Sequence, residues 1–487
     1  MGLTANDVYE IALEAVKKMH EEQGDDLLFP YDRIWLFSSQ ADRVPSAQRP
    51  GPQRRLIKNG FIEPTGEVMR AESAARAGSP TRQYRFGSSL ASSRPNPVAL
   101  KVASTHSHDE AARDVGIEAG LRELHRRIEN EGYIFSLAEL ANFYLALLAS
   151  PFVILSGISG TGKSLLPRKF AEQTGSGFRS IPVQPQWSDN SDLFGFVPTL
   201  SPGTFVEGRL VASLRSAMAN PKRLEIVLLD EMNLAPVEHY FSDFLSVMES
   251  RRRSGETIIT DRLPIELPAS DGPWDDLRAA VLPFNLKIIG TANMDETTRG
   301  FSPKVLDRAF SIEFDDPELT AFAEAAETPP IPGLLSELIA PLVDGKQPIT
   351  VNEALQNNQE WFEHIARLLS NVQEILSPAG VKFGFRTRDS ILLYLLNWKL
   401  LNLKDVISEN AALDFCLLQK VLPRVAGAGD LLGTALAKLE DWLMQDRKGT
   451  DAESSLGFNG PFVRSAQKAR RMRDLLESDG ATLYWGV

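Results

Sequence analysis

The sequence predicts an α/β protein: a parallel sheet with a phosphate-binding loop, followed by an all-α domain and preceded by a small α+β domain. Three observations support this. A glycine-rich loop follows an apolar strand at residues 152–164, strands and helices alternate as far as Pro317, and helical periodicity alone continues beyond it. We expect four parts, which are a winged-helix-like domain at 1–90, a linker at 91–115, the α/β core at 116–318 and the helical domain at 319–487.

Composition and charge narrow the classes of function. The 487 residues are 43% hydrophobic and 24% charged, and the formal net charge of −12 argues against a protein that coats nucleic acid over its whole surface. Positive charge is concentrated between Arg49 and Arg94, a stretch that contains nine Lys or Arg and three Asp or Glu residues. The single cysteine, Cys416, lies in an apolar helical run and is expected to be a buried, inert thiol. With neither a signal-peptide pattern nor a membrane-spanning one, we expect a cytoplasmic protein without membrane contact.

The first 90 residues carry the signals of a small α+β domain. Residues 4–20 follow the period of an amphipathic helix, a basic helix is expected over Pro52–Asn59, and Phe61–Glu63 and Tyr84–Phe86 are expected to pair as strands around a basic loop. This order is typical of a winged helix, which would bind double-stranded DNA. Docking on a protein partner and a solvated basic face are the alternatives. The basic residues are Arg54, Arg55 and Lys58 in the helix and Arg70, Arg76 and Arg82 in the loop.

The phosphate loop, residues 157–164, matches the pattern GxxxxGK[ST] between an apolar strand and the start of a helix. Its glycines permit a tight turn whose backbone N–H groups point inward around phosphates. The lysine supplies a charge for the β- and γ-phosphates, and the last hydroxyl can bind Mg²⁺. We therefore expect nucleoside-triphosphate binding by Gly157, Ile158, Ser159, Gly160, Thr161, Gly162, Lys163 and Ser164.

Polar side chains end two further strands of the expected sheet. Strands are expected at Phe178–Val183, Ile226–Asp230, Leu286–Asn293 and Phe310–Phe314. Chemistry in such sheets gathers at the carboxyl ends of the strands. Asp230 can hold Mg²⁺, Glu231 can orient or deprotonate an attacking water, and Asn293 can bridge the γ-phosphate and that water.

Arginines outside the loop are candidates for stabilising charge on the γ-phosphate. Arg308 precedes the last strand and could enter a neighbouring subunit's site as an arginine finger, with Arg299 as a reserve candidate. The alternative for Arg308 is a salt bridge within the chain, to Asp307 or Glu313. In the helical domain, Arg386 and Arg388 stand at a helix start, and one of them could reach the phosphates; the sequence does not choose between them.

These residues in this order resemble the AAA+ superfamily: phosphate loop, Asp230-Glu231, Asn293, a finger arginine and a helical lid. Within it, the stretch Leu229–Met248 resembles the McrB family, the NTPase motor of modification-dependent restriction systems. The resemblance covers roughly residues 135–485, and further similar stretches are Val183–Gly195, Gly290–Asp295 and Gln419–Pro423.

The resemblance implies an AAA+ NTPase that assembles into a ring, expected to be a hexamer, and uses ATP or GTP with Mg²⁺. It also implies an N-terminal domain that recognises DNA and a separate McrC-like nuclease partner, with hydrolysis driving DNA recognition or translocation in antiphage restriction. Asn293 is followed by Met-Asp-Glu-Thr, whereas the GTP-using prototype has Asn-Thr-Ala-Asp, so ATP and GTP both remain open. Two other hypotheses are a MoxR-like protein-remodelling ATPase and a binding module in which nucleotide only drives assembly.

Overall fold

A computed structural model describes residues 5–23, 29–30, 56, 62–70, 80–86, 106–294, 300–314, 320, 333–447 and 456–485. The chain divides into two compact units, 1–104 and 105–487. The boundary falls inside the range predicted as a linker, 91–115. Helix α4 (His106–Asn130) occupies the second part of that range, so the linker prediction extended too far toward the core.

The described part of the first unit contains a helix and a β-hairpin at the places predicted for them. Helix α1 (Ala5–Gln23) is followed by a three-stranded sheet in the order β1-β3-β2, with both pairs antiparallel. The strands are β1 (Phe29–Pro30), β2 (Ile62–Arg70) and β3 (Pro80–Phe86). Both hairpin strands are longer than predicted, so Arg70 and Arg82 lie in strands. Of the predicted basic helix, only Leu56 is described, as helical and buried; Arg54, Arg55, Lys58 and Arg76 lie outside the described residues.

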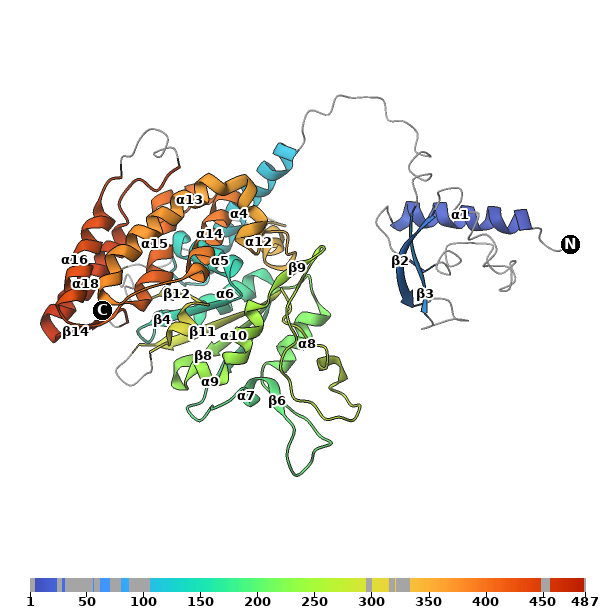
Figure 1. Ribbon diagram of the computed structural model, residues 1–487, viewed down its shortest axis with the longest axis horizontal. Helices are drawn as coiled ribbons and strands as arrows, with labels where there is room; N and C mark the ends of the chain where they lie inside the picture. The colour runs from blue at the N-terminus through green and yellow to red at the C-terminus, as the bar shows by residue number, and fades with distance from the viewer. Residues whose placement is uncertain are drawn as a thin grey trace. The chain divides into compact units, whose positions relative to one another are not determined.

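A five-stranded, all-parallel sheet is the centre of the second unit, in the order β12-β4-β11-β8-β5 (Figure 1). The three middle strands are apolar and buried almost throughout, as expected for a sheet covered on both faces. Four of the predicted strands are confirmed to within one residue at each end, while β4, predicted from the apolar residues 152–155, continues for two more residues. The five strands are β5 (Gly177–Pro182), β8 (Glu225–Asp230), β11 (Leu286–Asn293), β4 (Phe152–Gly157) and β12 (Phe310–Glu313).

Helices pack on the two faces of this sheet. Apolar residues recur at helical spacing from Val237 to Met248 and predict one helix, but the structure has two, because the backbone at Phe241 (φ −114°, ψ 0°) is distorted from regular helical angles. The helices of the core are α5 (Leu137–Ala149), α6 (Leu165–Thr174), α7 (Ser191–Phe194), α8 (Val211–Ala219), α9 (Val237–Tyr240), α10 (Ser242–Glu249) and α11 (Pro303–Leu306).

The C-terminal helices gather on one side of the sheet, while α8, α9 and α10 lie on the other (Figure 1). Helical periodicity predicts helices at 355–376, 389–402, 411–422, 430–445 and 461–477, and the structure has a helix at each place. The third continues as a π-helical turn, Leu417–Val421. Two short strands, β13 (Ala426–Ala428) and β14 (Ala481–Leu483), pair with each other, so the domain is not purely helical. The helices are α13 (Val351–Leu376), α14 (Phe385–Leu400), α15 (Glu409–Cys416), α16 (Asp430–Met444) and α18 (Val463–Asp479).

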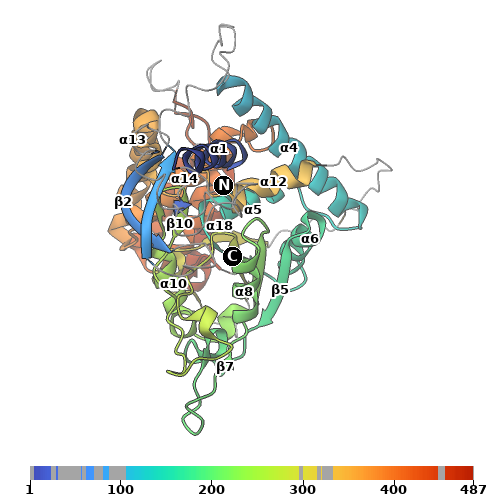
Figure 2. The ribbon, with the colours of Figure 1, turned by 90° about the vertical axis from the view of Figure 1, so that its right-hand side faces the viewer.

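The helical domain is joined to the core rather than separate from it. One hydrophobic core extends from Ile117 to Trp485. Helix α12 (Leu334–Val343), which the sequence assigned to the helical domain, packs against α4, where a Cβ at Gly120 would lie 2.9 Å from the Leu334 carbonyl oxygen. Figures 1 and 2 show these two helices side by side. The predicted boundary at 318/319 therefore does not separate two packing units.

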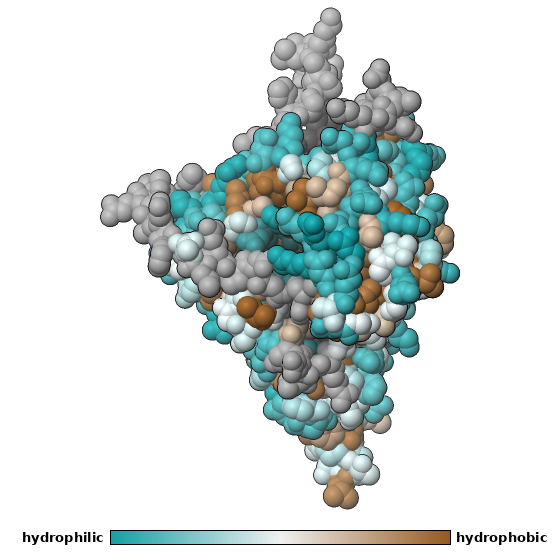
Figure 3. All heavy atoms as spheres, turned by 90° about the vertical axis from the view of Figure 1, so that its left-hand side faces the viewer, coloured by the Kyte–Doolittle hydropathy of each residue, from teal (hydrophilic) through white to brown (hydrophobic). Residues whose placement is uncertain are grey.

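A hairpin after β5 extends from the body of the core (Figure 2). Its strands are β6 (Gly195–Phe196) and β7 (Val206–Glu207), and Leu200 between them is 97% exposed. Apolar surface is visible at the lower end of Figure 3, where this hairpin lies. Among the described helices, none combines the length and apolar character needed to cross a bilayer.

Candidate nucleotide-binding site

The phosphate loop leaves the sheet at the end of β4 and enters α6, as predicted. Gly157, Gly160 and Gly162 have φ values of +137°, +87° and +93°, a region that L side chains rarely adopt. A Cβ at Gly162 would also lie 3.2 Å from the ring of Phe135. The glycines of the motif are therefore required by the backbone path of the loop.

Lys163 is buried, with a side chain that turns back over its own loop. Its Nζ donates to the carbonyl oxygens of Gly157 (2.9 Å) and Ile158 (2.5 Å). The ammonium group is thus held inside the curve of the loop, at the N-terminal end of α6 where the backbone dipole favours an anion. This arrangement fits a triphosphate.

Asp230 and Ser164 meet across neighbouring elements. The Ser164 hydroxyl donates to Asp230 Oδ1 at 2.8 Å, which joins the start of α6 to the end of β8. Thr291 donates to the same oxygen at 2.7 Å. A hydroxyl and a carboxylate that touch in this way can both bind Mg²⁺, which nucleotide sites usually hold with one or two protein groups and the phosphates.

Glu231 has an unusual backbone for a glutamate. Its φ of 54° lies in the left-handed region, which costs an L residue about 1–2 kcal/mol. The conformation is held from β11: Thr291 Oγ1 accepts from the Glu231 N–H at 2.9 Å, and Asn293 Nδ2 donates to Glu231 Oε1 at 2.9 Å. The structure therefore brings together the carboxylate and the amide that the sequence singled out.

Three residues that support this pair were not among the sequence candidates. Thr291 lies two residues before Asn293, on the same face of β11, so strand periodicity was the signal that could have found it. Asn233 donates to the Asn293 carbonyl at 3.0 Å. Gly290 leaves room for Met232, whose sulfur a Cβ at position 290 would overlap.

Arg308 lies at the end of the sheet opposite the phosphate loop, where the strands begin. Its carbonyl oxygen accepts from Ser150 Oγ at 3.1 Å, beside the start of β4, whereas the phosphate loop leaves the other end of that six-residue strand, about 20 Å away. The guanidinium forms an ion pair with Glu249 (Nε–Oε1 2.5 Å). The expected partners within the chain, Asp307 and Glu313, pair instead with other cations.

The lid arginines do not converge on the phosphate loop of their own chain. Arg386 pairs with the same Glu249 oxygen as Arg308 does (2.6 Å) and with Asp307 (3.7 Å). Arg388 pairs with Asp389, its neighbour in α14, and its guanidinium carbon lies 4.7 Å from the ring centroid of the exposed Phe385. Arg386 thus joins Arg308, and nucleotide contact by either lid arginine stays a prediction. Arg299 lies outside the described residues.

One family model agrees with this geometry. The family model of the AAA domain (dynein-related subfamily) matches residues 152–310, which run from β4 into β12. Residues 152–310 form an AAA domain, and the protein is a P-loop nucleoside triphosphatase. Residues 343–481, most of the helical domain, match a domain of unknown function (DUF8727). The crystal structure of a proposed ATPase from Cytophaga hutchinsonii is similar at 15% identity and a TM-score of 0.36, covering 65% of this chain and 89% of that one. No curated protein matches the chain.

Nucleotide and Mg²⁺ binding follow for a triphosphatase of this kind. In this AAA domain the loop glycines and Lys163 would hold the phosphates, and Ser164 and Asp230 would hold Mg²⁺. The metal neutralises phosphate charge when it is bound. The protein's own contribution is to fix Glu231 beside Asn293, where the carboxylate can take a proton from a water.

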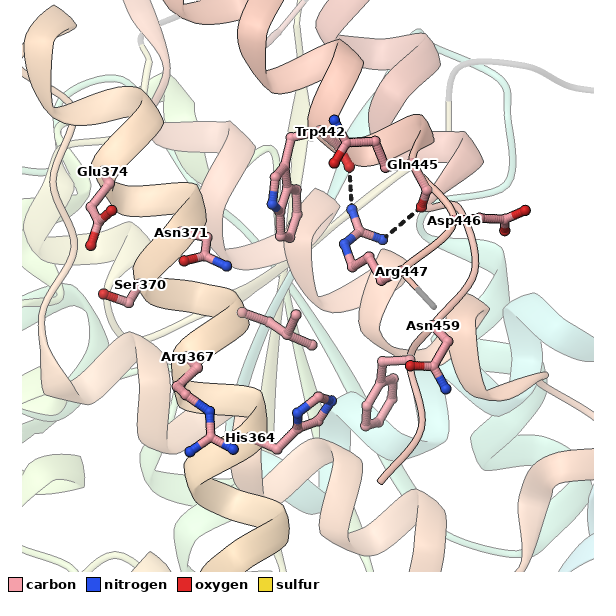
Figure 4. A pocket seen from close by; sticks show the side chains of 12 residues that line it. His364, Arg367, Ser370, Asn371, Glu374, Trp442, Gln445, Asp446, Arg447 and Asn459 are labelled. Carbon is pink, nitrogen blue, oxygen red and sulfur yellow. Dashed lines mark hydrogen bonds between the residues drawn. The ribbon is translucent and has the colours of Figure 1, made fainter. Parts of the chain in front are cut away.

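One hollow in the described part of the chain lies apart from the nucleotide site. It measures about 590 Å³ and lies in the helical domain, between α13 and the segments that flank the end of α16 (Figure 4). His364, Arg367 and Trp442 are among its lining residues, and none of the predicted site residues is. Arg447, at its rim, packs on the Trp442 ring and donates to the carbonyl oxygens of Gln445 and Gly460. Its guanidinium is thus bound beside the C-terminal end of α16.

Thr291→Val tests the support that β11 gives to the triphosphatase site. The variant keeps the shape of the side chain but removes the hydroxyl that joins Asp230 to the Glu231 N–H. We expect kcat to fall about tenfold, the size of a lost hydrogen bond to a charged group, while nucleotide affinity changes little. The matched control is Thr260→Val, a buried threonine that also makes two hydrogen bonds but lies away from the site. Equal loss of kcat in both variants would show a general loss of stability instead.

Proposed function

We propose that the protein is a ring-forming motor in which Arg308 of one subunit completes the nucleotide site of the next. The main support is the position of Arg308, which lies at the end of the sheet opposite the phosphate loop. An arginine there cannot reach the nucleotide bound by its own chain. Arg386 shares the carboxylate of Glu249 with Arg308, so two arginines stand together on the face that would meet the neighbour. The ring is expected to be hexameric, with ATP or GTP as its substrate.

We further propose that this motor acts on double-stranded DNA for an McrC-like nuclease partner in antiphage restriction. The support is the McrB-like sequence from Leu229 to Met248, together with a basic N-terminal region. In the N-terminal unit, the short strand β1 pairs with the second strand of the β2–β3 hairpin, the arrangement expected of a winged helix. Residues 1–90 would then bring DNA to the ring.

The test is steady-state hydrolysis of ATP and of GTP by the full chain, with and without double-stranded DNA. We expect DNA to raise the rate, and a triple variant with Arg54, Arg55 and Lys58 changed to alanine to lose that stimulation while keeping its basal rate. The control changes three exposed arginines of the helical domain and core, Arg464, Arg470 and Arg252. Hydrolysis that is indifferent to DNA in the wild type, with and without nuclease partner, would contradict the proposal.

The second candidate is a MoxR-like protein-remodelling ATPase. It is favoured by the family model that matches the core, which describes a dynein-related subfamily rather than a restriction motor. The exposed apolar hairpin tip at Leu200 would suit contact with an unfolded polypeptide. Hydrolysis stimulated by an unfolded protein and not by DNA would favour this candidate.

A further inference from the structure

Lys420 of the helical domain is fully buried and directed at the turn that carries Arg308. Its Nζ donates to the carbonyl oxygens of Leu306 (3.2 Å), Asp307 (2.9 Å) and Ala309 (2.6 Å). An ammonium group has three donors, and all three are used on this one turn. The turn connects α11 to β12, so its carbonyls include the C-terminal end of a very short helix, where a cation is favoured.

Side chains from other elements hold every carbonyl oxygen of this turn. Three accept from Lys420, and the fourth, that of Arg308, accepts from Ser150 Oγ. The peptide groups on both sides of Arg308 are therefore fixed from two directions. The path of the backbone at the finger residue depends on the helical domain on one side and on the start of β4 on the other.

Arg424 adds a second connection from the same segment. Its guanidinium pairs with Asp307, next to Arg308, and donates to Thr387 Oγ1 at 2.8 Å, next to Arg386. It also donates to the Lys420 carbonyl oxygen at 3.0 Å. One segment of the helical domain thus contacts the side chains next to both of the arginines that share Glu249, those of Asp307 and Thr387.

The local helix is shaped for this contact. Lys420 lies in the π-helical turn Leu417–Val421, a widened turn of the kind that is frequent at functional sites. Burial lowers the pKa of Lys420 to about 7, and the nearby Arg424 acts in the same direction. A buried amine is thus retained here against an electrostatic cost. The stretch Gln419–Pro423, one of the McrB-like sequences, contains this lysine and thereby contacts the turn that carries Arg308.

We propose that Lys420 is a positioning residue for Arg308, which fixes the finger turn so that the guanidinium enters the neighbouring subunit's nucleotide site. This rests on the proposed function, in which the finger acts between subunits. Lys420 touches no nucleotide in this scheme, and its effect passes through the backbone of residues 306–309. Loss of Lys420 is therefore expected to lower kcat and to leave nucleotide affinity unchanged.

The first measurement compares Lys420→Met with Lys399→Met in the full chain. Lys399 is also a lysine of the helical domain, and its Nζ donates to Asn358 and lies over the Trp361 ring, away from the finger turn and from the phosphate loop. We expect Lys420→Met to lower kcat about 10- to 100-fold with an unchanged nucleotide Kd, and Lys399→Met to keep its kcat. Ser150→Ala, which removes only the fourth contact of the turn, should lower kcat by a smaller factor. Wild-type kcat in both Lys420→Met and Ser150→Ala would overturn the proposal.

The second measurement mixes variants before assay. Glu231→Gln subunits have an intact finger but a disabled site, whereas Lys420→Met subunits have an intact site but a misplaced finger, so mixtures should regain activity that neither has alone. Arg308→Ala mixed with Glu231→Gln is the reference. Recovery in the reference but not with Lys420→Met would overturn the role of Lys420 while leaving the finger between subunits intact. No recovery in the reference would overturn the proposed finger itself.

Discussion

Replacing Glu231 by glutamine is expected to lower the rate of nucleotide hydrolysis about a thousandfold while the protein still binds nucleotide. A positioned general base contributes about 10²- to 10⁴-fold to a rate, and the amide has the shape of the carboxylate without its basicity. The substitution leaves the loop glycines, Lys163 and Asp230 untouched, so the phosphates and Mg²⁺ should bind as before. The measurement is kcat for ATP and GTP together with nucleotide Kd by fluorescence.

Glu238→Gln is the matched control for that experiment. Glu238 lies seven residues further along the same segment, is exposed on α9 and carries the same functional group. It should keep the wild-type rate. Wild-type turnover in Glu231→Gln would show that another group activates the water, whereas a loss of nucleotide affinity would show that the turn at residue 231 had collapsed.

Replacing Arg308 by alanine is expected to lower hydrolysis by about 10³-fold or more, again without loss of binding. Arginine fingers of phosphoryl-transfer enzymes contribute about 10³- to 10⁵-fold, because they stabilise charge that develops only in the transition state. Arg308→Lys should recover little, since the ammonium lacks the planar fork that binds two phosphate oxygens.

The alternative for Arg308 is a purely structural ion pair with Glu249. Glu249→Gln separates the two, because it removes the pair but leaves the arginine. We expect Glu249→Gln to keep most of its activity. If Glu249→Gln and Arg308→Ala lost the same activity and the same thermal stability, the salt bridge and not the finger would explain the effect.

The sequence was sufficient to predict the sheet and several of the residues that meet at its carboxyl end. Strand β11, for example, has the predicted bounds, because most of its residues are apolar and it ends in a polar one, and the glycines of residues 157–164 are required by a backbone that only glycine adopts easily. These are local signals. They require no knowledge of which segments meet in space.

The features that the sequence did not predict depend on contacts between distant segments. The sequence around Glu249 contains no motif that predicts a role for it. Its role follows from the ion pairs that Arg308 and Arg386 both form with it. Lys420 likewise meets its carbonyls more than a hundred residues away. The sequence did not predict the break between α9 and α10, because apolar residues continue at helical spacing across it. The backbone distortion at Phe241 has no counterpart in that spacing.

A buried polar contact between the core and the helical domain has a consequence for the ring motor proposed above. Asn142 of α5, the helix that leads into β4, accepts at 2.8 Å from Tyr394 and at 2.7 Å from Gln419, both in the helical domain. Buried hydrogen bonds of this kind are costly to break, and a continuous apolar core surrounds them. The core and the helical domain should therefore move together as one rigid body. In a ring, the conformational change driven by hydrolysis would then be a movement of adjacent subunits relative to one another, and bending within a subunit would be small.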